Sequence, residues 1–184
     1  LSASASVTNS VSCTGDDDGE ITVAVDLSSI GAGAPYQYSL DNGVTYPGTP
    51  FPNLVGDSTY QVKVRDQNAC QYTSTIYLAD PAVISHSTIA ETPPNMNGYN
   101  ISCFGVSDGT ITASATGGTG AFEYSDDLGT TYQTSPVFPG LSAGLHIITY
   151  KDFHDCEADT QITLIEPLLF TISPSPTDAH CPGP

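Results

Sequence analysis

Two segments of the chain alternate between apolar and polar side chains. Isoleucine or valine fills every second position from Ile21 to Val25, and tyrosine or valine does so from Tyr60 to Val64. Successive side chains of a β-strand point to opposite faces, so this period of two predicts strands with one buried and one wet face. Between them, Asp41-Asn42-Gly43 predicts a tight turn, because Asn and Gly tolerate positive φ.

The chain also repeats itself. The segment SCTGDDDGEIT at Ser12–Thr22 returns as SCFGVSDGTIT at Ser102–Thr112. Further pairs follow in the same order: Tyr36–Tyr46 with Phe122–Tyr132, Phe51–Leu54 with Phe138–Leu141, the segments ending at Cys70 and Cys156, and Ile76–Pro81 with Ile162–Pro167. Ordered self-similarity of this kind indicates a tandem repeat.

We predict a first repeat over residues 1–80, a second over 81–166, and the opening strand of a third over 167–184. Each full copy has room for roughly seven short strands, which is typical of an immunoglobulin-like domain. The expected fold is therefore all-β, with tandem immunoglobulin-like β-sandwiches. The partial third copy suggests an excerpt from a longer protein.

The charge balance narrows the possible partners. Three basic residues face 20 acidic ones, for a formal net charge of −17. Such a surface repels phosphate backbones and anionic membranes, which argues against nucleic-acid binding and membrane association. No apolar segment approaches the ~20 residues that cross a bilayer. The acidity suits calcium, although self-repulsion that keeps the protein soluble explains it equally well.

The cysteines follow the repeat. Cys13 and Cys70 belong to the first copy, Cys103 and Cys156 to the second, and Cys181 opens the third. We expect one disulfide within each full copy, and this implies an oxidising, extracellular compartment. The alternative is a metal site or a catalytic thiol, but there is no Cys-x-x-Cys and the histidines share no spacing with the cysteines.

The densest acidic run, Asp16-Asp17-Asp18, is the candidate calcium site. The second copy has Val106 and Ser107 in place of the first two aspartates. What both copies retain is an Asp-Gly step, which a tight turn needs. The turn interpretation is therefore favoured over the metal site. Catalysis has little support, because no histidine is common to both copies and no Gly-x-Ser-x-Gly occurs.

Together these motifs resemble the SprB repeat, a family found in long surface proteins of Bacteroidetes, including a gliding-motility adhesin. The resemblance rests on the two cysteine–Asp-Gly–Ile-Thr segments, on GGTGAFEYS at Gly117–Ser125, on GLSAGLHIITYKD at Gly140–Asp152, and on the closing cysteines. The first copy departs from the pattern where VGDSTY replaces the LSAG turn.

The family implies type IX secretion, display at the outer cell surface, and tandem adhesive or stalk domains without catalytic residues. We therefore expect a non-enzymatic segment of a bacterial adhesin whose partners are an external surface or polysaccharide and the neighbouring repeats. The alternative is a carbohydrate-binding or accessory module of a secreted protein, with exposed tyrosines such as Tyr46 and Tyr132 stacking on sugar rings. The sequence leaves the ligand-binding residues unknown.

Overall fold

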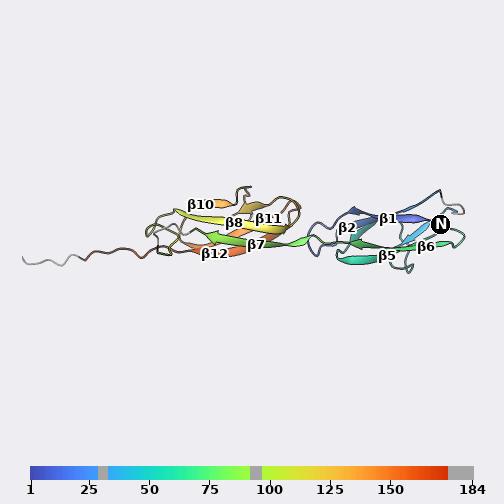
Figure 1. Cartoon of the computed structure of the whole chain (residues 1–184), viewed down its shortest axis with the longest axis horizontal. Coiled ribbons are helices and arrows are strands. Elements are labelled where there is room, and N and C mark those ends of the chain that lie inside the picture. The colour runs from blue at the N-terminus through green and yellow to red at the C-terminus, as the bar shows by residue number, and fades with distance from the viewer. Residues whose placement is uncertain (29–32, 92–96, 174–184) are drawn as a thin grey trace, which may run out of the picture. The chain divides into compact units, whose positions relative to one another are not determined.

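The computed structural model describes residues 1–28, 33–91 and 97–173, and every regular element among them is a β-strand (Figure 1). The predicted all-β class is confirmed. None of the described residues forms a helix long and apolar enough to cross a membrane. The strands are β1 Ala3–Asn9, β2 Gly19–Val25, β3 Gln37–Ser39, β4 Phe51–Leu54, β5 Ser58–Arg65, β6 Gln71–Leu78, β7 Ala82–Ala90, β8 Gly109–Gly118, β9 Glu123–Ser125, β10 Val137–Leu141, β11 Gly144–Lys151 and β12 Glu157–Leu164.

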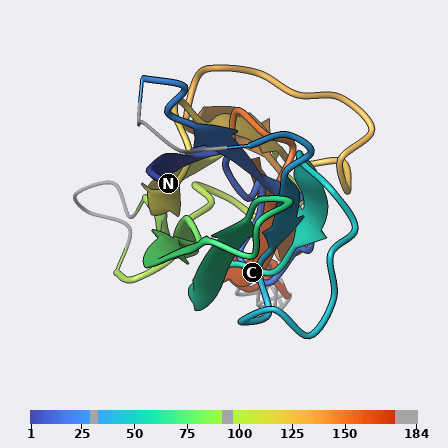
Figure 2. The same ribbon diagram turned by 90° about the vertical axis from the view of Figure 1, so that its right-hand side faces the viewer.

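The first copy forms two three-stranded sheets, ordered β1-β2-β4 and β3-β5-β6. Strands β1 and β2, in blue, lie on one side of this copy, and β5 and β6, in teal and green, lie on the other (Figures 1 and 2). The alternating pattern has the predicted effect, since Ile21 and Val23 of β2 are buried, as are Val62 and Val64 of β5. These side chains meet in a single core between the sheets, with Ala3, Val11, Phe51 and Leu78.

The second copy repeats this order, with sheets β10-β8-β7 and β12-β11-β9. Its buried side chains fall at equivalent positions, so that Ile111 corresponds to Ile21 and Phe138 to Phe51. Each copy has six strands in the described part of the chain, one fewer than the roughly seven for which the sequence leaves room.

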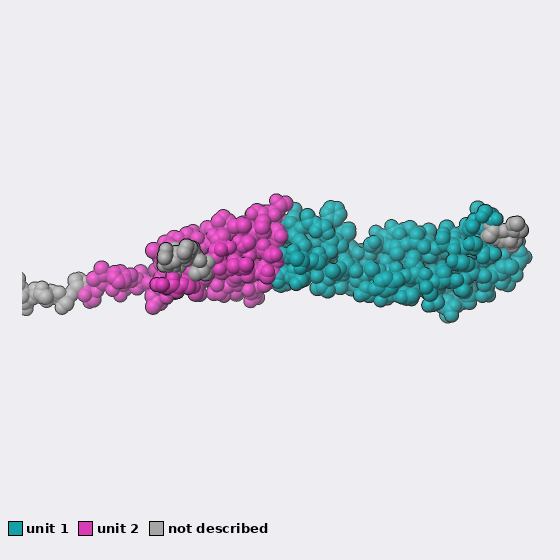
Figure 3. Space-filling view, in the orientation of Figure 1, with its two compact units in different colours: residues 1–86, 115–123, 149–158 teal, residues 87–114, 124–148, 159–184 magenta. Residues whose placement is uncertain are grey.

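The chain divides into two compact units that do not follow the repeats (Figure 3). Unit 1 combines Leu1–His86 with two segments of the second copy, Ala115–Glu123 and Thr149–Ala158, each of which contains a loop and the strand ends beside it. Unit 2 holds the remainder, namely Ser87–Ser114, Tyr124–Ile148 and Asp159–Pro184. The repeat boundaries after residues 80 and 166 stay predictions from the sequence. Cys181 lies outside the described residues.

Candidate functional site

The opening loop of the first copy joins β1 to β2 and carries Cys13. At its start, the Ser12 backbone N–H donates a hydrogen bond of 3.0 Å to the Asp18 carboxylate. Hydrogen bonding from Ser12 holds the pKa of Asp18 below its usual value. The Gly15 N–H donates to a carboxylate oxygen of Asp80, also at 3.0 Å, which places the loop beside the residues that follow β6.

The closing loop of the second copy joins β11 to β12 and is arranged around Asp152, which is only 3% exposed. This carboxylate accepts hydrogen bonds from the backbone N–H and hydroxyl of Thr119, at 2.7 and 2.9 Å. It also accepts from the N–H groups of His154 and Cys156, at 2.9 and 3.0 Å. Burial raises the pKa of Asp152, but these bonds outweigh it, and the pKa lies below its usual value.

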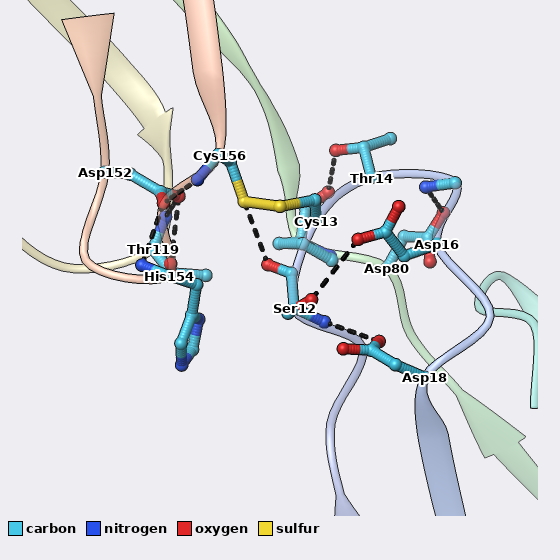
Figure 4. The surroundings of a disulfide bond; sticks show 12 residues. Ser12, Cys13, Thr14, Asp16, Asp18, Asp80, Thr119, Asp152, His154 and Cys156 are labelled. Carbon is cyan, nitrogen blue, oxygen red and sulfur yellow. Dashed lines mark hydrogen bonds between the residues drawn. A yellow bond between two sulfur atoms is a disulfide. The ribbon is translucent and has the colours of Figure 1, made fainter. Parts of the chain in front are cut away.

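The two loops are covalently joined within unit 1 by a disulfide between Cys13 and Cys156 (Figure 4). Their Cα atoms lie 5.6 Å apart, although 143 positions separate them in sequence. Cys156 Sγ also lies 3.2 Å from the Ser12 carbonyl oxygen, a contact rather than a hydrogen bond because a disulfide sulfur carries no hydrogen. The bridge connects one copy of the repeat to the other.

The expected pairing within each copy, Cys13 with Cys70 and Cys103 with Cys156, is therefore wrong. The reason is the length of β6. Cys70 immediately precedes this strand of eight residues, whereas the Cys13 loop contacts Asp80 beyond its far end. A strand of eight residues spans roughly 26 Å. Disulfide Cα atoms lie within about 7 Å, so the first copy cannot close this bond.

Cys70 and Cys103 are both exposed and unbonded. Each occupies the same position in its own copy as a bonded cysteine in the other, Cys70 matching Cys156 and Cys103 matching Cys13. Among the described residues, one opening cysteine and one closing cysteine are thus free thiols.

The described residues do not bring the three candidate aspartates together as calcium ligands. Within the acidic run, Asp18 accepts from the Ser12 N–H and Asp16 accepts from the Ser12 hydroxyl at 3.3 Å. A hollow of about 330 Å³ beside the disulfide is lined in part by Asp16, Asp155 and Glu157. Among the described residues, however, no group of three or more His, Cys, Asp or Glu side chains is placed to hold a metal ion.

A second structured turn occurs in both copies, and in the first copy it contains the predicted tight turn, with positive φ at Asn42 (59°) and Gly43 (86°). The serine that anchors it was not predicted from the sequence. Ser39 and Ser125 are fully buried, and each hydroxyl donates to an aspartate two residues later, Asp41 or Asp127. Each aspartate in turn accepts from a threonine four residues further on. Hydrogen bonds from Ser125 and Thr131 lower the pKa of Asp127 to about 2, and equivalent bonds lower the pKa of Asp41 strongly. The recurring Tyr-Ser-x-Asp was the available signal.

The candidate sugar-stacking tyrosines are half-buried rather than exposed. The Arg65 guanidinium carbon lies 4.0 Å from the ring centroid of Tyr46 and covers one of its faces. Tyr132 also makes further contacts of its own. The Tyr46 ring therefore does not present two bare faces for sugar stacking.

Comparison with known proteins adds two findings. The SprB repeat family matches residues 5–45 and 99–128, which contain the opening cysteine and the Asp-Gly turn of each copy. Comparison with curated proteins finds no match. Among solved structures, the chain is similar to fibronectin(III)-like modules of Clostridium thermocellum CbhA, with 14% identity over 89% of this chain and 95% of that one. The TM-score of 0.31 is too low to support a fold assignment. The predicted resemblance is confirmed, and both copies in this chain carry a match to the SprB repeat.

Proposed function

We propose that this chain is a non-catalytic segment of a large bacterial cell-surface adhesin, built from tandem immunoglobulin-like repeats. The observation that carries the proposal is the SprB match in both copies together with a disulfide between them. A covalent bond from one repeat to another suits modules that act in series. Such a bond between repeats is not needed for catalysis in an enzyme whose domains each carry a separate active site.

The disulfide also supports an extracellular location. Disulfides persist in oxidising compartments and are rare in the cytosol. In the chain-entropy description, closing a loop of 143 residues stabilises the folded state by about 5 kcal/mol. This bond supplies a stabilisation that holds only outside the reducing cytosol.

Export through the type IX system and a role in gliding or attachment follow from the family in this proposal. The partner is an external surface or a polysaccharide, and the neighbouring repeats are partners within the array. The formal net charge of −17 fits this arrangement, because self-repulsion keeps parallel arrays from clumping.

The test is made on cells that produce the full-length protein. Antibodies against this chain should label intact cells, and deletion of residues 1–166 in frame should lower attachment to an abiotic surface. The variant Val44→Ser, which changes one exposed side chain, serves as the control and should retain surface labelling and attachment. Labelling that requires permeabilised cells would refute the proposal.

A carbohydrate-binding function is the second candidate, and one observation favours it. An open groove of about 360 Å³ in the first copy is lined mainly by apolar side chains, including Leu40, Pro47, Pro50 and Tyr60. A glycan array distinguishes the two functions, since a binding module should capture a defined sugar and lose it on Tyr60→Ala. The matched variant Tyr132→Ala, which changes a half-buried ring of the second copy, should leave that binding intact.

A further inference from the structure

We propose that Cys103 and Cys70 are the two halves of further disulfides of the Cys13–Cys156 kind. In this scheme, the opening cysteine of each repeat bonds the closing cysteine of the repeat that follows it. Cys103 then pairs with a following repeat, and Cys70 pairs with a preceding one. The inference concerns the linkage between repeats, so it holds or fails independently of what the adhesin attaches to.

The opening loops of the two copies have the same internal geometry. The Ser102 N–H donates to Asp108 at 3.0 Å, as the Ser12 N–H does to Asp18. The Gly105 N–H donates to the Glu166 carboxylate at 2.6 Å, in the way that Gly15 contacts Asp80. Cys103 is thus held as Cys13 is, in a loop already shaped for the bond.

The closing loops agree equally well. Asp66 is 5% exposed and accepts from the N–H groups of Asn68 and Cys70, both at 2.9 Å. Asp152 accepts from the equivalent N–H groups of its own loop at 2.9 and 3.0 Å. In both loops the residue before the cysteine has positive φ, 63° at Ala69 and 62° at Asp155. The backbone around the free Cys70 therefore has the same conformation as the backbone around the bonded Cys156.

The residues beside the opening cysteine contact the following repeat in the first copy. There the Thr14 hydroxyl donates to the Pro81 carbonyl oxygen at 2.9 Å, at the start of the predicted second repeat. In the second copy, Phe104 and Val106 occupy the positions of Thr14 and Asp16 and are 52% and 40% exposed. Thr14 and Asp16 are exposed too, so the contact with the following repeat leaves these positions open in the bonded pair.

The bond forms by thiol–disulfide exchange. The thiolate of one cysteine attacks a small disulfide oxidant and releases one small thiol, and the partner thiolate then displaces the second. Two protein thiols lose two electrons and two protons, and the oxidant is reduced to two thiols. The product is one protein disulfide, with no other group changed.

The first test uses the full-length protein from producing cells, with free thiols blocked by an alkylating reagent before lysis. Peptide mapping by mass spectrometry should find Cys103 joined to the closing-loop cysteine of the next repeat and Cys70 joined to an opening-loop cysteine of the preceding one. Recovery of both as alkylated peptides would overturn the proposal.

The second test uses this chain with Cys181→Ser, so that only two thiols remain. With oxidised glutathione, a mixture of the Cys70→Ser and Cys103→Ser variants should form a Cys103–Cys70 dimer at least about tenfold faster than either variant alone, a preference of ~1.4 kcal/mol. The parent chain should form longer multimers through the same bond. Equal rates in the mixture and in the single variants would show undirected oxidation and overturn the pairing rule.

Discussion

The two opening loops, one around Cys13 and the other around Cys103, share their hydrogen bonds but differ in covalent state. Each has a serine N–H bonded to an aspartate and a glycine N–H bonded to an acidic side chain near the end of its copy. Yet Cys13 is bonded to Cys156, whereas Cys103 is exposed and free. The hydrogen bonds of the loop are thus the same whether or not its cysteine is bonded.

The largest expected effect on stability is a difference between serine substitutions of the two opening cysteines. Cys13→Ser should lower the free energy of unfolding by about 5 kcal/mol, because the loop of 143 residues is no longer closed in the unfolded chain. Guanidinium unfolding without reductant measures this. Cys103→Ser should change stability by less than about 0.5 kcal/mol, as for other exposed substitutions. An equal loss of stability in the two variants would contradict the assignment of Cys13 as bonded and Cys103 as free.

The closing loops give the next largest effect. Asp152→Ala should cost about 3 kcal/mol, because it removes the acceptor that the N–H groups of Thr119, His154 and Cys156 share. Asp66→Ala should cost less, since no hydroxyl of the described residues donates to Asp66 and the bond from the Gly33 N–H is long at 3.4 Å. Thermal unfolding of the two variants tests this order, and a larger loss for Asp66→Ala would reverse it.

The same aspartates predict a pH dependence. Burial raises the pKa of both Asp152 and Asp66, but hydrogen bonds outweigh it and hold both below the usual value near 3.8. A carboxylate with a lowered pKa in the folded state stabilises the protein above its unfolded pKa, and this contribution is lost as the pH falls through the folded pKa. The difference between wild type and Asp152→Ala should therefore shrink below about pH 4.

The recurring serine–aspartate turns should behave alike in the two copies. Ser39→Ala and Ser125→Ala each remove a buried hydroxyl that bonds an aspartate and a glycine N–H, at a cost of about 1 kcal/mol. Since the pKa of Asp127 is lowered to about 2, the contribution of its turn should be complete above the usual carboxyl value near 3.8 and should be lost as the pH falls to about 2. Hydrogen exchange at Gly43 and Gly129 reports each turn separately. Protection lost in only one copy would show that the turns are not equivalent.

The smallest effect concerns the acidic run that only the first copy has. Asp16→Asn with Asp17→Asn should change stability by less than about 0.5 kcal/mol, because both side chains are exposed. Excess calcium should leave the Tm of wild type and variant unchanged. A calcium-dependent rise in wild type that a chelator reverses, and that the variant lacks, would restore the metal interpretation.

Much of the fold was accessible from the sequence because burial leaves a period-two pattern. The alternation around Ile21 and Val62 located β2 and β5, and the repeat transferred both assignments to the second copy. His146, at the position of Tyr60, is half-buried, and its Nε2 lies 2.9 Å from the Ser142 carbonyl oxygen.

The disulfide pairing was not accessible in the same way. Counting cysteines within each copy assumed that a repeat closes on itself, and the positions of Cys13 and Cys70 along the chain do not reveal that β6 separates them. The partner, Cys156, is 143 positions away and belongs to another copy. Local periodicity carries no information about such a contact, because the contact depends on which ends of the strands meet.

The disulfide also determines how the chain responds to a pulling force. A load applied at the two ends passes through the bridge between Cys13 and Cys156, whose Cα atoms are 5.6 Å apart. The intervening chain would extend to about 500 Å if it unravelled. An intact disulfide prevents this extension. Under tension the segment between Cys13 and Cys156 therefore hardly lengthens, and it can extend only after a reductant has broken the disulfide.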